Sequence, residues 1–259
     1  MTNSPDQVNR DVVVIGGCGH VGLPLALAFA DRGARVGIYD VSEAAVATVN
    51  SGRMPFAEPG ADEVLSRMLG AGRLEASADP AIVATAEHVI VVIGTPVDEH
   101  LNPKQIAITK ALGGCSEFLR DGQLLVLRST VFPGVTALVE KMMAKLGREI
   151  EVAFCPERIA EGKAMSELFE LPQIVSARTP AGTKRASALF GRLTGKIVVM
   201  TPEEAERILR EETFIDAAEA NRLMEEMDRA EEIEDAAQGL NVPQALGTPQ
   251  TASSPRHSA

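Results

Sequence analysis

Cysteine, basic residues and long apolar runs are all scarce in this chain of 259 residues. No apolar run is long enough to cross a membrane, and residues 1–10 lack the apolar core of a signal peptide. Cys18, Cys115 and Cys155 are odd in number and widely spaced, so they predict neither a disulfide framework nor a metal site. The 36 acidic residues outnumber the 25 basic ones, which argues against a nucleic-acid-binding surface. We therefore expect a cytoplasmic protein with no membrane or nucleic-acid partner.

The clearest functional pattern of the sequence lies near its start. Residues 12–15 form an apolar run typical of a buried parallel strand, and Gly17-Cys18-Gly19-His20-Val21-Gly22 follows at once. Residues 23–30 are apolar, rich in alanine and suited to a helix. A second predicted strand, residues 35–39, ends at Asp40. The G-x-G-x-x-G pattern between a strand and a helix, with an acid about 20 residues later, indicates dinucleotide binding. The alternative is a glycine-rich turn that holds no ligand.

Each glycine of the pattern has a separate predicted task. We expect Gly17 to allow a tight turn, Gly19 to let the backbone approach a pyrophosphate, and Gly22 to let the helix pack closely on the sheet. Together with His20 and Val21 they form the predicted phosphate loop, where the positive end of the helix faces the phosphates.

Asp40 indicates which of the two nicotinamide cofactors, NAD or NADP, the chain binds. A carboxylate can accept two hydrogen bonds from a ribose diol, whereas a 2′-phosphate would meet its negative charge. The next residue is Val41 rather than an arginine that could neutralise that phosphate. The sequence therefore predicts NAD as the cofactor in preference to NADP.

Beyond Asp40, strand and helix patterns alternate, which predicts an α/β fold with a Rossmann-like, doubly wound and mostly parallel sheet. Further strands are predicted at residues 89–93, 123–127, 150–154, 173–176 and 196–200, and helices at 42–50, 61–69, from 79, 104–119, 134–146, 179–193 and from 201. Three parts follow from this pattern. They are an NAD-binding domain (8–200), a long acidic helical segment (201–238) and a disordered tail rich in Pro, Ser, Thr, Gln and Ala (239–259).

Four polar residues follow predicted strands within three positions: Asp40, Thr95, Thr130 and Glu157. Ligands in such sheets bind at the carboxyl ends of the strands, so these side chains could face one crevice. For Thr95, Thr130 or Glu157 taken alone, the alternative is simple capping of the next helix.

Five motifs in this order and spacing resemble the UDP-glucose/GDP-mannose dehydrogenase family. They are Gly17-Cys18-Gly19-His20-Val21-Gly22-Leu23-Pro24, Phe56-Ala57-Glu58-Pro59-Gly60, Gly94-Thr95-Pro96, Arg128-Ser129-Thr130-Val131-Phe132-Pro133-Gly134 and Cys155-Pro156-Glu157-Arg158-Ile159-Ala160-Glu161-Gly162. The resemblance implies oxidation of the C6 alcohol of a nucleotide sugar to a carboxylate with two NAD, for polysaccharide biosynthesis. The last motif looks closer to members that act on UDP-N-acetylhexosamines, such as UDP-N-acetylmannosamine, than to those that act on UDP-glucose.

The resemblance also implies roles for single residues. Thr95 and Thr130 would lie at the NAD, and Thr130 would hold a water. Glu157 would be the general base that hydrolyses a covalent thioester intermediate. The backbone that would lie against the sugar nucleotide is that of Arg158, Ile159, Ala160 and Glu161.

The resemblance stops after residue 206. Leu209 stands where the family has its oxyanion-stabilising lysine, and Thr213 stands where it has an asparagine. The signature that carries the family's nucleophilic cysteine is missing, and Cys155 is better interpreted as a buried, inert thiol. The chain could work with a second chain that supplies the missing half, or as a homodimer. It could equally be an NAD-binding module or truncated pseudoenzyme without turnover, or another Rossmann dehydrogenase such as a 3-hydroxyacid type.

Overall fold

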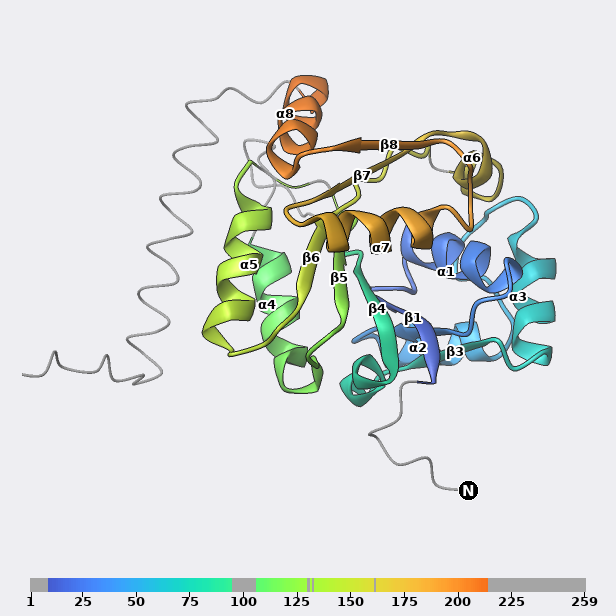
Figure 1. Cartoon of the computed structure of the whole chain (residues 1–259). Helices are drawn as coiled ribbons and strands as arrows, with labels where there is room; N and C mark the ends of the chain where they lie inside the picture. The colour runs from blue at the N-terminus through green and yellow to red at the C-terminus, as the bar shows by residue number, and fades with distance from the viewer. Residues whose placement is uncertain (1–8, 95–105, 130, 132, 161, 214–259) are drawn as a thin grey trace, which may run out of the picture.

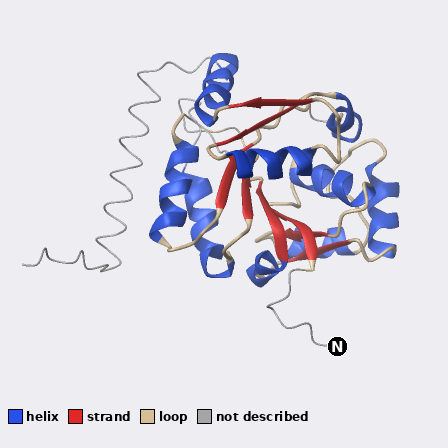
Figure 2. Cartoon of the chain, in the orientation of Figure 1, coloured by secondary structure: helices blue, strands red, loops and turns tan. Residues whose placement is uncertain are grey.

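The computed structural model describes residues 9–94, 106–129, 131, 133–160 and 162–213 (Figure 1). One sheet of eight strands, in the order β3-β2-β1-β4-β5-β6-β7-β8, has helices on both faces (Figure 2). The strands are β1 (Arg10–Ile15), β2 (Val36–Tyr39), β3 (Leu74–Ser77), β4 (Ala86–Val91), β5 (Leu124–Leu127), β6 (Glu151–Phe154), β7 (Gln173–Ala177) and β8 (Ile197–Met200). The α-helices are α1 (Gly22–Asp31), α2 (Glu43–Asn50), α3 (Ala61–Gly70), α4 (Ile106–Cys115), α5 (Val135–Lys145), α6 (Ala164–Glu170), α7 (Pro180–Phe190) and α8 (Pro202–Thr213), and the 3₁₀ helices are η1 (Pro80–Thr85) and η2 (Ser116–Phe118).

The predicted mostly parallel, doubly wound sheet is confirmed. Strands β1 to β6 all pair in parallel, and only the β6–β7 pairing is antiparallel. The strand order reverses between β1 and β4, because β2 and β3 lie on one side of β1 while β4 to β6 lie on the other. Such a reversal point is where open α/β sheets bind dinucleotides, outside the carboxyl ends of the strands. Two elements were not predicted from the sequence, the edge strand β3 and the short helix α6.

Strand β1 is covered on both faces of the sheet, which explains why it is apolar without interruption. Val12 and Val14 point to the core beneath α1, α3, α6 and α7, whereas Val13 and Ile15 point to the core beneath α4, α5 and α8. Figure 1 shows α4 and α5 side by side on one flank of the sheet, with α1 and α3 on the other.

Helix α8 packs onto this unit at its first turns, where Ala205 and Leu209 are buried in the same core as α5. The division of the chain at residue 200 stays a prediction, and the rest of the acidic segment and the tail lie outside the described residues. Within the described ranges, no helix has the length and apolar character needed to cross a bilayer.

Candidate functional site

The turn between β1 and α1 is built from glycines, but its left-handed residue is Gly16. Gly16 has φ of +72°, and a Cβ there would lie 2.1 Å from the carbonyl oxygen of Val92. Gly17 lies in the same turn, where a Cβ would come within 2.8 Å of the Ile38 side chain and 2.9 Å of the Val14 carbonyl oxygen. The absence of a side chain at Gly17 thus permits both the turn and close packing on β2.

Gly22 and Gly19 differ in what surrounds them. A Cβ on Gly22 would lie 2.7 Å from the oxygen of Gly16 and from Cα of Gly17, so α1 packs directly on the turn. A Cβ on Gly19 would meet only the oxygen of Gly16, at 3.8 Å. The packing around Gly19 thus leaves room for a side chain, and a ligand that approaches the backbone gives a reason for glycine there.

The start of α1 is open on its outer side. Its N-cap is Val21, whose side chain makes no capping hydrogen bond, and Val21 and His20 are exposed. The N–H of Leu23 donates to the Gly19 carbonyl oxygen at 3.0 Å, and no side chain caps this helix start, so the positive end of the helix dipole faces outward and favours an anion such as a phosphate. His20 stacks on Phe56 with a ring-centroid distance of 4.0 Å, which brings the loop before α3 beside this turn.

Asp40 lies at the end of β2, next to the glycine turn. Its Oδ2 accepts a hydrogen bond from the backbone N–H of Cys18 at 3.0 Å, and its Oδ1 accepts one from Ser42 N–H at 3.0 Å. A carboxylate offers about four lone-pair sites, so each oxygen can still accept one hydrogen bond from a ribose hydroxyl. Burial and the negative charge of Asp40 raise the pKa of the Cys18 thiol to about 12, which makes it a packing residue and no nucleophile.

A second cluster lies after β5 and β6, around the fully buried Arg128. Its Nε donates to Glu157 Oε2 at 2.8 Å, and its Nη2 lies 2.5 Å from the same oxygen. Its Nη1 donates to the carbonyl oxygens of Cys155 and Pro156 and to Oε1 of Gln173, at 3.0, 3.3 and 2.9 Å. One guanidinium therefore joins the ends of β5 and β6 to the start of β7, and Glu157 is its only anionic partner among these contacts.

Both carboxylate oxygens of Glu157 already accept hydrogen bonds from the protein. Besides Arg128 on Oε2, its Oε1 accepts from the N–H groups of Arg158 and Ile159 at 2.8 and 3.0 Å. The N–H of Ala160 donates to Oε2 of Glu167 at 2.8 Å. In this conformation the N–H groups of three predicted substrate-binding residues point at the protein's own carboxylates.

The loops after β4 and β5 are tied together by Ser129. Its hydroxyl accepts from Ile93 N–H and donates to the Ile93 carbonyl oxygen, both at 2.8 Å. Thr95, Thr130 and Glu161 lie outside the described residues, so their roles stay predictions. Asp40 and Glu157 both follow strands at the carboxyl edge, but β1, β4 and β5 separate their strands, so the two groups do not adjoin.

Two residues, Cys155 and Leu209, bear on whether the described residues supply a nucleophile and an oxyanion-stabilising group. Cys155 is fully buried, as predicted, and burial raises the pKa of its thiol to about 12 although the charge of Arg128 opposes this. Leu209, at the position of the family's lysine, packs in the core beneath the sheet. Within the described ranges, no group of three His, Cys, Asp or Glu residues could hold a metal ion.

The turn with its open face at Gly19, the uncapped helix start and the acid after the second strand define a dinucleotide-binding Rossmann domain. Residues 10–194 match the NAD binding domain of the UDP-glucose/GDP-mannose dehydrogenase family, and the chain belongs to that family. It is 31% identical over 248 residues to UDP-N-acetyl-D-mannosamine dehydrogenase of Yersinia pestis, covering 90% of this chain and 56% of that protein.

Solved structures agree in fold. UDP-D-ManNAc dehydrogenase of Pyrococcus horikoshii matches with a TM-score of 0.74 and 26% identity, over 79% of this chain and 50% of that one. A UDP-glucose dehydrogenase of Pyrobaculum islandicum matches with a TM-score of 0.72 and 28% identity, over 80% and 49%. The chain thus spans about half the length of the curated relatives it matches.

Sequence reasoning missed two charged residues that hold this edge of the sheet together. Arg128 opens the fourth family motif, but no role was predicted for it. A charged residue directly after a buried strand was nevertheless a signal that its side chain has a buried partner. Glu206, described below, carried no local signal because its partners lie about seventy residues earlier.

Proposed function

We propose that this chain is the NAD-binding half of a nucleotide-sugar 6-dehydrogenase. Its reaction would be oxidation of the C6 alcohol of a UDP-sugar, of the UDP-N-acetylmannosamine or UDP-glucose type, to the uronic acid for polysaccharide biosynthesis. The observation that carries the proposal is the turn at Gly19, open to a ligand beside Asp40. The relatives named above support the substrate class. The free, buried cysteines favour a reducing compartment, which for this proposal is the cytoplasm.

The residues present suit the binding half of the reaction. Bound NAD would supply the acceptor for the hydride. The backbone at Gly19 and the start of α1 would hold its pyrophosphate, and Asp40 would accept hydrogen bonds from its ribose. By the family resemblance, Thr95 and Thr130 would lie at the cofactor, and the backbone of residues 158–161 would face the sugar nucleotide.

Hydrolysis of a thioester is the step that this chain serves only in part. Glu157 would act as the base with Thr130 holding the water, yet Glu157 Oε1 already accepts from two backbone N–H groups. Those N–H groups must move before Oε1 can take a proton from water. The thiols of Cys18, Cys115 and Cys155 all have raised pKa values, so these residues are unsuited to act as the nucleophile. The alternative is an NAD-binding module without turnover.

Titration calorimetry on the unaltered chain and two variants tests the cofactor assignment. The unaltered chain should bind NAD, and NADP at least tenfold more weakly, because Asp40 repels a 2′-phosphate by a cost of about 1–3 kcal/mol. Gly19→Ala should weaken NAD binding while the melting temperature is unchanged, since a Cβ fits there in the folded chain. Gly113→Ala, an open glycine position in α4, is the matched control and should keep full affinity. Equal affinity of Gly19→Ala and the unaltered chain for NAD would refute the assignment.

Product analysis tests the catalytic half separately. We expect the purified chain with NAD and UDP-N-acetylmannosamine or UDP-glucose to form no uronic acid. Two NADH per sugar and a uronate product would show that this chain carries its own nucleophile.

A further inference from the structure

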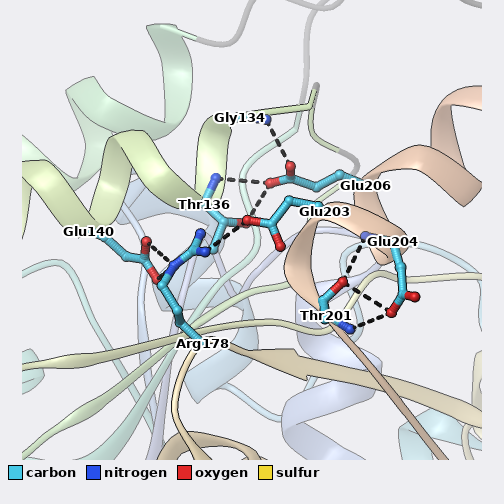
Figure 3. A network of polar contacts seen from close by, with 8 residues as sticks. All are labelled: Gly134, Thr136, Glu140, Arg178, Thr201, Glu203, Glu204 and Glu206. Atoms are coloured by element: carbon cyan, nitrogen blue, oxygen red, sulfur yellow. Dashed lines mark hydrogen bonds and ion pairs between the residues drawn. The ribbon is translucent and has the colours of Figure 1, made fainter.

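Helix α5 starts without a capping side chain of its own, and a glutamate of α8 takes that place. The N-cap residue Gly134 has φ of +96° and no side chain to offer. Glu206 Oε2 accepts from Gly134 N–H at 2.8 Å, and its Oε1 accepts from Thr136 N–H at 3.0 Å and from the Thr136 hydroxyl at 2.6 Å (Figure 3). The carboxylate is 3% exposed, so these are buried contacts between an anion and the positive end of a helix.

The contacts around Glu206 fix α8 in place. Thr201 and Glu204 cap α8 reciprocally, with Thr201 N–H to Glu204 Oε2 at 2.9 Å and Glu204 N–H to Thr201 Oγ1 at 3.2 Å. Arg178 joins Glu140 of α5 to Glu203 of α8 at 2.9 and 2.8 Å, as Figure 3 shows. Glu206 and the Arg178 bridge are thus two polar links between α5 and α8, and of these two only Glu206 reaches the backbone where α5 begins.

The loop that joins β5 to α5 is held where it begins and where it ends. Where it begins, Ser129 is hydrogen-bonded to Ile93, which follows β4. Where it ends, Gly134 and Thr136 are hydrogen-bonded to Glu206. The loop stands at the carboxyl edge on the β4–β5 side of the reversal point, whereas Asp40 stands on the β2 side. A dinucleotide lies across such a reversal point, so with its adenosine ribose at Asp40 its nicotinamide half reaches the β4–β5 side.

We propose that Glu206 is a positioning residue for the nicotinamide half of the cofactor. By holding Gly134 and Thr136 at the start of α5, it fixes the end of the loop between β5 and α5, on the side of the sheet that this half of NAD would reach. The position of α8, which leads to the part of the chain beyond the sheet, thereby becomes coupled to cofactor binding. This inference rests on the proposed function, because it assumes that NAD binds at the glycine turn.

The experiment compares NAD with ADP-ribose, which lacks the nicotinamide ring. Calorimetric affinities for both ligands are measured on the full chain, well below each variant's melting temperature. Glu206→Gln puts an amide NH₂ where the carboxylate accepts, so one N–H of Gly134 or Thr136 loses its acceptor. We expect NAD affinity to fall roughly 3- to 30-fold, while ADP-ribose affinity stays within about twofold. Glu204→Gln is the control on the same helix, because the side-chain and backbone hydrogen bonds described for Glu204 are with Thr201 and not with α5, and it should change neither affinity.

Thr136 gives a second pair of variants that disturbs the fold less. Thr136→Ala removes the 2.6 Å hydroxyl contact and should lower NAD affinity alone, and Thr136→Ser keeps the hydroxyl and should restore it. An equal loss for NAD and ADP-ribose in Glu206→Gln would overturn the inference, as would no loss for either. The same selective loss in Glu204→Gln would also overturn it. If the unaltered chain binds neither ligand, the proposed function fails and the inference fails with it, which separates the two cases.

Discussion

Replacing Glu157 with glutamine should destabilise the fold by leaving a buried charge without its counter-ion. Arg128 is fully buried, and its remaining partners are neutral oxygens of Cys155, Pro156 and Gln173. Glutamine has one oxygen in place of two. Its NH₂ group would therefore face either the guanidinium or the N–H groups that now donate to Oε1.

The size of the effect follows from the burial of the pair. Removing one partner of a buried ion pair costs about 3–5 kcal/mol. The Glu157 side chain is 11% exposed, so we take the lower end, about 3 kcal/mol. For a domain of this size each kcal/mol lowers the melting temperature by about 2–4 °C, which predicts a fall of about 6–12 °C.

Thermal unfolding followed by circular dichroism or calorimetry measures this change. Glu117→Gln, at an exposed position of η2, is the control and should lie within about 0.5 kcal/mol of the unaltered chain. Arg128→Met added to Glu157→Gln should cost less than the sum of the two single changes, because the second change removes the charge that the first one stranded. A fall of less than about 2 °C in Glu157→Gln, or strict additivity in the double variant, would refute the argument.

Three further predictions follow from other parts of the molecule. Burial lowers the pKa of His88 below its ordinary value of 6.5, so the folded state favours the neutral ring and stability should fall as the pH drops below about 6.5. His88→Asn should flatten that dependence in denaturant titrations at several pH values, and an unchanged slope would contradict it. Gly22→Ala should cost about 1–3 kcal/mol and weaken NAD binding, since its Cβ would meet backbone at 2.7 Å, as thermal melts and calorimetry would show. Deleting residues 239–259 should leave the melting temperature unchanged within about 1 °C, because their composition offers little to bury; a fall of several degrees would contradict this.

The fold could be predicted where the sequence signal is local. Val12 to Ile15 are buried on both faces of the sheet, so the strand is a continuous apolar run that stands out in the sequence. Strand β3 was missed because Leu74 to Ser77 is short, lies at the sheet edge and carries the exposed Glu75. The antiparallel β6–β7 pairing was also beyond reach, because strand and helix patterns alternate in the same way whichever direction a strand takes.

The candidate site, like the fold, was predictable only where its residues lie close together in the sequence. The glycine turn and Asp40 were predictable because their tasks depend on residues close in sequence and on a known spacing. The left-handed conformation of Gly16 was not predicted, since it depends on the contact between Gly16 and Val92 across β1 and β4. The pairing of Arg128 with Glu157 depends on β5 lying beside β6, with Leu127 opposite Phe154, and no local pattern states that neighbour relation.

Asp40 and Glu157, at the carboxyl edge of the sheet, differ in whether their carboxylates can still accept a hydrogen bond. This difference distinguishes the proposed cofactor binding from the proposed turnover. Asp40 accepts one hydrogen bond on each oxygen and keeps capacity for a ribose diol without any rearrangement. Glu157 accepts two backbone N–H groups on one oxygen and the buried Arg128 on the other. A base needs a lone pair directed at its water, so Glu157 could serve as the proposed base only after the backbone at Arg158 and Ile159 moves. Cofactor binding at Asp40 would need no such movement. The proposed hydrolysis would need that movement and a thioester, which the thiols of Cys18 and Cys155, with their raised pKa values, are unsuited to form.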